Sequence, residues 1–118
     1  IVVGGGYIAV EFAGIFNGLG AKTTQLYRGD MFLRGFDQDV REFVAQEIIK
    51  KGVDLKFNCD IDSVEKLPNG RLQANLNNGE TMEADEILYA TGRNAKTANL
   101  GLEEVGVELR KNGSRASP

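Results

Sequence analysis

The stretch IVVGGGYIAVE, residues 1–11, decides the fold of this chain. A short apolar strand runs into the pattern Gly-x-Gly-x-x-Ala, formed by Gly4, Gly6 and Ala9, and then into a helix. In a nucleotide-binding βαβ unit the first glycine permits a tight turn, the second lets a pyrophosphate approach the backbone, and the small third residue lets the helix pack on the strand. The start of the helix offers unpaired N–H groups and a positive dipole end to phosphates. The alternative is a glycine-rich turn that binds nothing.

The residues that follow complete a βαβ unit of the expected length. Gly20 stands where a helix commonly ends in glycine, and an apolar strand is predicted over residues 22–27. Apolar residues recur at helical spacing before that glycine and predict an amphipathic helix over residues 7–19: Ile8, Phe12, Ile15, Phe16 and Leu19. This context favours nucleotide binding over an empty turn.

The rest of the chain predicts an α/β fold with two kinds of sheet. Asp37 is the expected N-cap of a helix over residues 38–51, and a strand follows at 53–58. Three further segments, separated by turns at Asn69-Gly70 and at residues 76–80, predict an antiparallel meander: residues 60–67, 71–75 and 81–84. Residues 86–90 are expected to form a buried parallel strand. The predicted fold is a Rossmann-like, three-layer nucleotide-binding domain with a parallel sheet and this three-stranded meander.

Composition excludes several classes of protein. The 118 residues carry 14 basic and 17 acidic side chains, a net charge of −3, which argues against a general nucleic-acid binder. No apolar run reaches the length of a membrane span. The single cysteine, Cys59, and the absence of histidine argue against a zinc site and fit a reducing cytoplasm, so we expect no metal and a cytoplasmic protein.

We expect residues 1–118 to form one domain. The chain begins inside a strand without a starting methionine, which indicates a piece of a longer protein. Residues 114–118 have no periodicity and are expected to be a frayed end or an expression remnant.

The end of the second strand indicates which dinucleotide binds. NAD sites usually carry Asp or Glu there, to accept hydrogen bonds from the ribose 2′-hydroxyl. Here Tyr27 and Arg28 stand at that place, and Arg34 follows across a short loop. Arginine forks suit a 2′-phosphate, so NADPH is the predicted ligand. Asp30 lies in the same loop and is expected to point outward.

Residues 4–20 resemble the NADPH-binding domain of glutathione reductase, a member of the FAD-dependent pyridine nucleotide–disulfide oxidoreductases. The resemblance extends through residues 27–28, 33–37 and 90–93, and covers nearly the whole chain. The related lipoamide dehydrogenases typically carry glycine at the place of Ala9 and a carboxylate at the place of Tyr27. Two departures stand out: Gly5, where many relatives have alanine, and Gly29, where some have a polar or basic residue that helps to hold the 2′-phosphate.

The resemblance implies roles for matching residues. Tyr7 would cover the flavin ring and swing away when the nicotinamide enters, and Glu11 would pair with a lysine of the FAD domain near the nicotinamide. Gly92 would let the backbone approach the cofactor, and Arg93 would lie near the cofactors at the domain junction. The full set expected to contact cofactor is Gly4, Gly5, Gly6, Tyr7, Ile8, Ala9, Glu11, Tyr27, Arg28, Arg34, Thr91, Gly92 and Arg93.

The resemblance also implies a reaction for a longer parent protein. NADPH would give a hydride to FAD, FAD would reduce a cysteine pair, and that pair would reduce glutathione disulfide in a homodimeric enzyme assembled through another domain. This chain has no Cys-x4-Cys and no histidine, so alone it is expected to bind NADPH without catalysis and to hold no catalytic residue.

Several alternatives stay open at this point. A parent specific for trypanothione or mercuric ion would carry the same kind of module. Another alternative is a SAM-dependent methyltransferase, which usually has an acidic residue at the end of the second strand, where this chain has Tyr27 and Arg28. A non-catalytic nucleotide sensor would need a surface that binds a partner protein, and the sequence indicates no exposed apolar patch that could serve as one.

Overall fold

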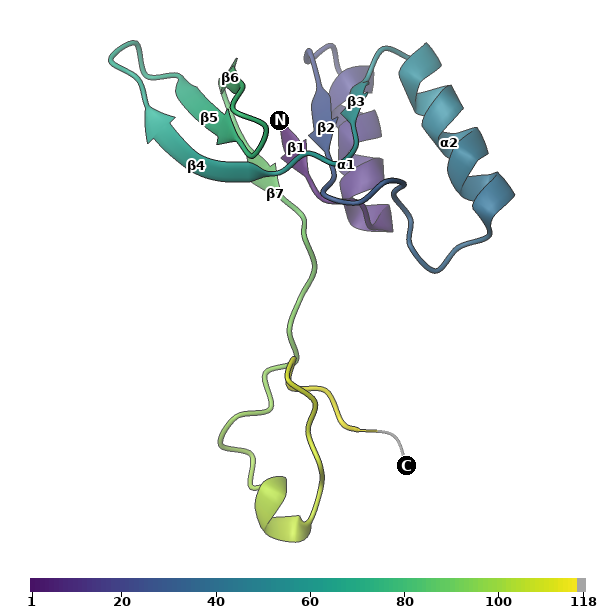
Figure 1. Cartoon of the computed structure of the whole chain (residues 1–118), viewed down its shortest axis with the longest axis vertical. Coiled ribbons are helices and arrows are strands. Elements are labelled where there is room, and N and C mark those ends of the chain that lie inside the picture. The colour runs from purple at the N-terminus through teal and green to yellow at the C-terminus, as the bar shows by residue number, and fades with distance from the viewer. Residues whose placement is uncertain (117–118) are drawn as a thin grey trace.

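The computed structural model describes residues 1–116 and arranges them as two sheets, two helices and an extended C-terminal segment (Figure 1). A four-stranded parallel sheet has the order β3-β2-β1-β7, and a three-stranded antiparallel sheet has the order β4-β5-β6. The parallel strands are β1 (Val2–Val3), β2 (Thr24–Leu26), β3 (Asp54–Lys56) and β7 (Leu88–Tyr89). The antiparallel strands are β4 (Ile61–Lys66), β5 (Leu72–Leu76) and β6 (Thr81–Ala84), and the helices are α1 (Tyr7–Gly18) and α2 (Gln38–Lys50).

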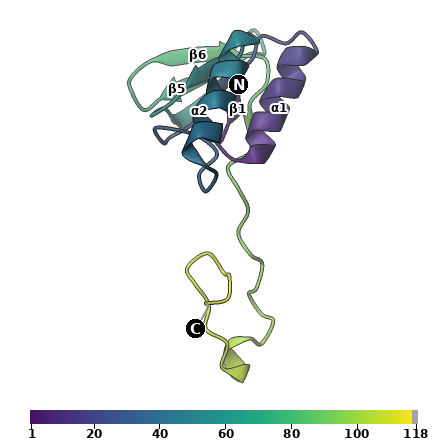
Figure 2. The same ribbon diagram turned by 90° about the vertical axis from the view of Figure 1, so that its right-hand side faces the viewer.

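The two sheets and the helices form three layers. Both helices cover one side of the parallel sheet, and the antiparallel sheet lies on its other side (Figures 1 and 2). One apolar cluster joins the helices to the parallel sheet through Val2, Ala9, Ala13 and Val53. A second cluster joins the two sheets through Leu26, Cys59, Ala74 and Leu76. The predicted α/β fold with a parallel sheet and a three-stranded antiparallel meander is confirmed.

Helix α1 ends one residue before its predicted end at residue 19, and its predicted apolar stripe does not face the sheet. Ala9 and Ala13 are fully buried, whereas Ile15 is 51 % and Leu19 82 % exposed. Ile8, Phe12 and Phe16 are exposed as well. Helix α1 is apolar on nearly all sides, so periodicity could not identify the packed face, and alanines permit the closest approach to the sheet. The expectation of no exposed apolar patch was therefore wrong.

The segment between β2 and β3 follows the prediction closely. Asp37 is the N-cap of α2, because its Oδ1 accepts a hydrogen bond of 3.0 Å from the backbone N–H of Asp39. Gly52 follows the end of α2 with φ +105°, a conformation that favours glycine. In the meander, the Asn69-Gly70 turn is also as predicted, with Gly70 at φ +83°.

Strand β7 is shorter and more exposed than predicted. The sequence predicted a buried strand over residues 86–90, but only Leu88 and Tyr89 pair with β1, and Tyr89 is 54 % exposed. The physical reason is position, since β7 is the last strand in the order of the parallel sheet and has one neighbour only. Its backbone still continues to Ala90, whose N–H donates to the Val3 carbonyl at 2.8 Å.

Residues 91–116 form an extended segment that leads away from the two sheets and the helices (Figures 1 and 2). This segment contains one short 3-10 helix, η1 (Glu103–Val105). Its end forms a small antiparallel bridge between Leu109 and Arg115, and the N–H of Ala116 donates to the Glu108 carbonyl at 2.8 Å. Residues 114–116 are hydrogen-bonded within this segment, and the prediction that they form a frayed end or an expression remnant stays a prediction. For residues 117–118 that prediction lies outside the described residues.

None of the described helices has the length and apolar character needed to cross a membrane.

Candidate nucleotide-binding site

The glycine turn joins the end of β1 to the start of α1. Gly4 has φ +139°, and a Cβ there would collide with the carbonyl oxygen of Ala90, so only glycine fits. Gly6 is the N-cap residue of α1 and has no side chain to cap the helix. A Cβ on Gly6 would meet no atom within 4 Å, so the space in front of the helix start is open. The unpaired N–H groups of the first helical turn face a space that a phosphate could fill.

A pocket of about 420 Å³ opens at this turn. Its lining comes from the carboxyl ends of the parallel strands, because Gly4 follows β1, Tyr27 follows β2 and Thr91 follows β7. In open α/β sheets ligands bind at this edge. The complete lining is Val3, Gly4, Gly5, Gly6, Leu26, Tyr27, Arg28, Arg34, Asp60 and Thr91. Seven of these are residues that the sequence predicted to contact cofactor.

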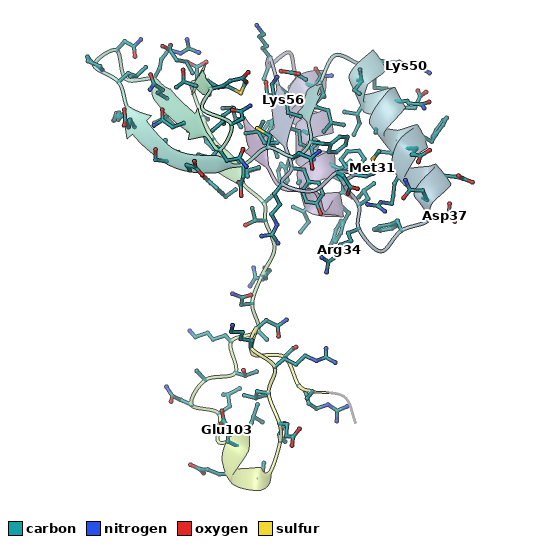
Figure 3. All side chains as sticks on the ribbon, viewed as in Figure 1. Met31, Arg34, Asp37, Lys50, Lys56 and Glu103 are labelled. Carbon is teal, nitrogen blue, oxygen red and sulfur yellow. The ribbon has the colours of Figure 1, made fainter. Side chains whose placement is uncertain are left out.

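The loop after β2 folds back onto the glycine turn and so brings Arg34 to the pocket. The N–H of Leu33 donates to the Gly5 carbonyl at 2.6 Å. Arg41 of α2 holds the loop from the other side, donating from Nε to the Phe32 carbonyl at 2.8 Å and from Nη2 to the Met31 carbonyl at 2.7 Å. Figure 3 shows Arg34 projecting from this loop on the side from which the C-terminal segment leaves. No sequence signal marked Arg41 for this role.

The charges in the pocket differ from the prediction at one place. Arg28 and Arg34 are exposed and line it, and Asp30 is exposed outside its lining, as expected. Asp60, which was not among the predicted site residues, adds a carboxylate from the segment between β3 and β4. That carboxylate is fixed in place, since its Oδ1 accepts a hydrogen bond of 2.9 Å from the N–H of Ile61.

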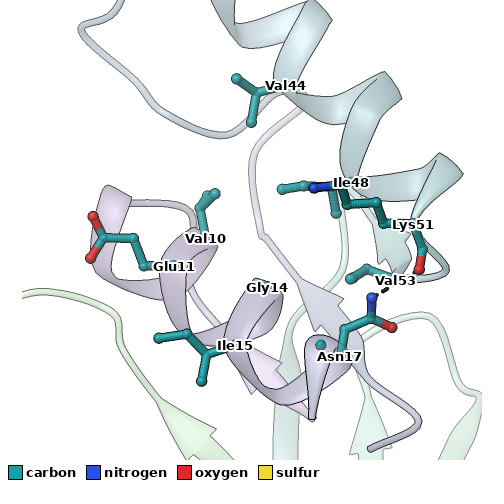
Figure 4. Close-up of a pocket in the computed structure, with 10 residues that line it drawn as sticks. Val10, Glu11, Gly14, Ile15, Asn17, Val44, Ile48, Lys51 and Val53 are labelled. Atoms are coloured by element: carbon teal, nitrogen blue, oxygen red, sulfur yellow. Dashed lines mark hydrogen bonds between the residues drawn. The ribbon is translucent and has the colours of Figure 1, made fainter. Parts of the chain in front are cut away.

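Six of the predicted contact residues do not line this pocket. Tyr7 and Ile8 are exposed on the first turn of α1, Ala9 is buried beneath it, and Gly92 and Arg93 are exposed on the C-terminal segment. Glu11 lines a different groove of about 500 Å³ between α1 and α2. Figure 4 shows that groove, in which the Asn17 side-chain amide donates to the Lys51 carbonyl at 2.8 Å.

Gln25 supports the glycine turn from within the core. Its side chain is fully buried, and its Nε2 donates to the Gly4 carbonyl at 3.0 Å. Its Oε1 is buried without a hydrogen-bond partner in the described part of the chain. The sequence pattern did not identify Gln25, because a polar residue inside an apolar strand gives no indication of the carbonyl that it will bind.

Cys59 lies directly before Asp60 and is buried between the two sheets. Burial raises the pKa of its thiol, the charges of Glu80 and Asp60 raise that pKa further, and Lys56 lowers it. The thiol is therefore protonated at neutral pH and unsuited to nucleophilic chemistry. Residues 1–116 contain no group of three or more His, Cys, Asp or Glu side chains arranged to hold a metal ion.

A glycine turn between a parallel strand and a helix, open to a pocket with two arginines, is the arrangement found in α/β proteins that bind dinucleotides. Comparison with known proteins narrows this class. The chain belongs to the pyridine nucleotide-disulphide oxidoreductase family, whose family model matches residues 1–116.

Similar proteins are disulfide reductases. The chain is 50 % identical over 113 residues to glutathione reductase of Burkholderia cepacia, covering 96 % of this chain and 25 % of the relative. It is 38 % identical over 117 residues to trypanothione reductase of Trypanosoma congolense, covering 97 % of this chain and 24 % of the relative. The chain thus spans about a quarter of the length of the curated relatives that it matches.

Two solved structures share the fold over nearly the whole chain. The HOCl-induced flavoprotein disulfide reductase RclA of Escherichia coli superposes with a TM-score of 0.81 at 31 % identity, covering 98 % of this chain and 26 % of RclA. An engineered water-forming NADPH oxidase, described as bound to NADPH, has a TM-score of 0.82 at 25 % identity, covering 96 % of this chain and 24 % of the oxidase.

Proposed function

We propose that this chain is the NADPH-binding module of a flavin-dependent disulfide reductase. The observation that carries the proposal is one pocket that unites the glycine turn with Arg28 and Arg34, while Tyr27 stands where an NAD site has a carboxylate. Similarity to glutathione reductases and to an NADPH-bound oxidase supports it.

The residues present fit such a cofactor. The open space at Gly6 and the free N–H groups of α1 suit the pyrophosphate. Arg28 and Arg34 suit the 2′-phosphate, since each charge-assisted hydrogen bond contributes roughly 1.5–3 kcal/mol. Two such contacts would favour NADPH over NADH by roughly a hundredfold or more.

Four residues outside the pocket are proposed to act at its edge: Tyr7, Glu11, Gly92 and Arg93. We propose Tyr7 as a gate over the nicotinamide, with Glu11 and Arg93 facing a flavin domain. Tyr7 stands at the first turn of α1 with 59 % of its surface exposed, which leaves it free for such a contact. Within the whole reductase, NADPH held by this pocket would be the hydride source for reduction of a disulfide by way of a flavin.

The substrate and assembly of the whole reductase are part of the same proposal. We propose glutathione disulfide as the substrate, a homodimer assembled through another domain, and a cytoplasmic location. Trypanothione disulfide or a mercuric substrate is the alternative, and similarity to a trypanothione reductase supports the first of these. The chain itself contributes binding, because one buried cysteine and no histidine give it no means to reduce a disulfide.

The exposed apolar face of α1 favours one further candidate, a nucleotide sensor that passes its state to a protein partner. A sensor would bind NADPH without passing on its hydride.

Calorimetric titration of the chain with NADPH and with NADH tests the proposal. We expect NADPH to bind at least a hundredfold more tightly, and the double variant Arg28→Ala, Arg34→Ala to remove that preference. The matched control is Arg110→Ala with Arg115→Ala, which deletes two exposed arginines of the C-terminal segment and should change neither affinity. Equal binding of the two cofactors by the unaltered chain, or a preference that survives loss of Arg28 and Arg34, would contradict the assignment.

A further inference from the structure

Gln25 carries a fully buried side-chain amide in the middle of β2. It pairs with Val2 on the neighbouring strand β1. Successive side chains of a strand point to opposite faces of the sheet, and Leu26 belongs to the apolar cluster between the two sheets. The Gln25 side chain therefore lies on the other face of the parallel sheet. That face is covered by the helices and has an apolar core around Val2, Ala9 and Ala13.

The Gln25 amide is only partly hydrogen-bonded. Its Nε2 donates to the Gly4 carbonyl at 3.0 Å, whereas its Oε1 is buried without a partner within residues 1–116. An unpaired polar atom in the core lowers the free energy of unfolding, and an apolar side chain of similar size would avoid that cost. Packing therefore does not account for glutamine at this position. What an apolar side chain could not supply is the hydrogen bond to Gly4.

Both polar groups of Gly4 are tied to β2. Its N–H donates to the Leu26 carbonyl at 2.9 Å, and its carbonyl accepts the hydrogen bond from Gln25. Gly4 has φ +139°, and glycine backbone adopts more conformations than that of any other residue. The hydrogen bond from Gln25 is thus the one that fixes the orientation of the peptide group joining Gly4 to Gly5.

The opposite edge of that peptide group carries the N–H of Gly5. The C=O and N–H of a trans peptide point in opposite directions, and none of the peptide bonds within residues 1–116 is cis. The Gly5 N–H therefore points away from the buried Gln25 side chain. Gly5 lines the nucleotide pocket, and its own carbonyl accepts from the N–H of Leu33 at 2.6 Å. Gly5 is thus fixed from the core by Gln25 and from the loop after β2 by Leu33.

We propose that Gln25 is a positioning residue of the nucleotide pocket: it holds the Gly4 carbonyl in the core and so presents the N–H of Gly5 to the pyrophosphate of the bound dinucleotide. This inference rests on the proposed function, because it concerns the same pocket. The pyrophosphate is common to NADPH and NADH. Gln25 therefore contributes affinity for both cofactors and no preference between them.

Calorimetric titration of the variant Gln25→Met tests the inference. Methionine has a similar length and volume but no hydrogen-bond donor. We expect the affinities for NADPH and NADH to fall by the same factor, about threefold to tenfold, as the loss of one hydrogen bond predicts. The affinity for 2′-AMP, which has no pyrophosphate, should stay the same. The melting temperature of the free chain should not fall, because one unpaired buried oxygen, Oε1, is exchanged for another, the Gly4 carbonyl.

The matched control is Gln73→Met in β5. The Gln73 side chain donates to Asn75 and lies outside the pocket lining, so its replacement should change no affinity. Nuclear magnetic resonance gives a second readout. In the unaltered chain NADPH should move the Gly5 amide proton downfield, since hydrogen bonding to a phosphate oxygen deshields it, and Gln25→Met should reduce that shift. An unchanged affinity for NADPH in Gln25→Met overturns the inference. An equal loss for 2′-AMP also overturns it, because the whole pocket would then be damaged.

The unaltered chain separates this inference from the proposed function. If it prefers NADPH, and Gln25→Met binds both cofactors as tightly, the inference is wrong and the proposed function stands. If it binds NADPH and NADH equally, and Gln25→Met weakens both, the assignment to NADPH is wrong and the inference stands. Binding of neither cofactor by the unaltered chain contradicts both.

Discussion

Asp60 is the one carboxylate among the residues that line the nucleotide pocket, where it accompanies Arg28 and Arg34. A negative charge there weakens the binding of a 2′-phosphate, because two negative charges a few ångströms apart repel each other. We predict that Asp60→Asn raises the affinity for NADPH about threefold to tenfold and leaves that for NADH nearly unchanged. Asparagine keeps the Oδ1 that accepts from Ile61, so the local fold should persist. Calorimetric titration measures both affinities.

The control for that experiment is Asp62→Asn on the exposed side of β4, which removes the same charge outside the pocket lining. An Asp60→Asn variant that binds NADPH no better than this control would show that the carboxylate does not face the phosphate.

Cys59 makes the stability of the fold depend on pH in the alkaline range. Its pKa is raised in the folded state, first by burial, whereas an exposed thiol in the unfolded chain has a pKa of about 8.5. Between these two values the folded state holds a proton that the unfolded state has lost, so the free energy of unfolding falls as the pH rises. The stabilisation is complete below about pH 8.5 and is lost as the pH passes through the folded-state pKa.

Urea unfolding at a series of pH values between neutral and alkaline checks this effect. We predict that Cys59→Ala slightly lowers the free energy of unfolding at neutral pH, because a packing contact is lost. Above about pH 8.5 the free energy of unfolding should fall less steeply with pH in the variant than in the unaltered chain. An equally steep decline in the variant would assign it to other groups.

What the sequence could predict at this scale depended on distance along the chain. The glycine turn and the two arginines were predictable, because each lies in a short local pattern. Arg41, Gln25 and Asp60 were not, because their positions depend on tertiary contacts. Gln25 binds the carbonyl of a residue 21 positions away, and Asp60 reaches the pocket only because β3 pairs with β2.

At the scale of elements, helix α1 shows where periodicity stops being informative. Its bounds followed from Gly6 and Gly20 on either side, and they were predicted almost to the residue. The face of α1 that packs on the sheet was not predicted. The large apolar residues indicated one side of the helix, whereas the side that is buried carries Ala9 and Ala13. Small residues carry little weight in a hydrophobic pattern, yet they allow the helix to approach the sheet.

This difference between the faces of α1 is measurable. We predict that Ala13→Leu lowers the free energy of unfolding by about 1–3 kcal/mol, because the larger side chain overfills a fully buried contact. The matched variant Ile15→Ser changes a half-exposed residue of the same helix and should cost less than about 1 kcal/mol. Urea unfolding of both variants gives the comparison. A larger loss from Ile15→Ser would mean that the apolar stripe is the packed face after all.

At the scale of the whole molecule, the described residues fall into a layered body and a segment that stands away from it (Figure 1). The radius of gyration is 17.5 Å, against roughly 13–14 Å for a compact chain of this length. The backbone hydrogen bonds of residues 93–116 all join members of that same segment. This division could not be predicted from the sequence, because apolar residues such as Leu100 and Val105 continue beyond β7 although they are exposed in the structure.

That division bears on the predicted single domain of residues 1–118, which stays a prediction. We expect the body, residues 1–90, to be the cooperative unit, because its layers share the two apolar clusters around the parallel sheet. Hydrogen exchange should then find protected amides in β1, β2 and α1, and near-unfolded exchange rates over residues 93–116, where few apolar contacts oppose opening. A chain ending at Arg93 should melt at the same temperature and bind NADPH with the same affinity. If that shortened chain melted lower or lost its NADPH binding, the C-terminal segment would belong to the cooperative unit, and the nucleotide pocket would depend on contacts beyond β7.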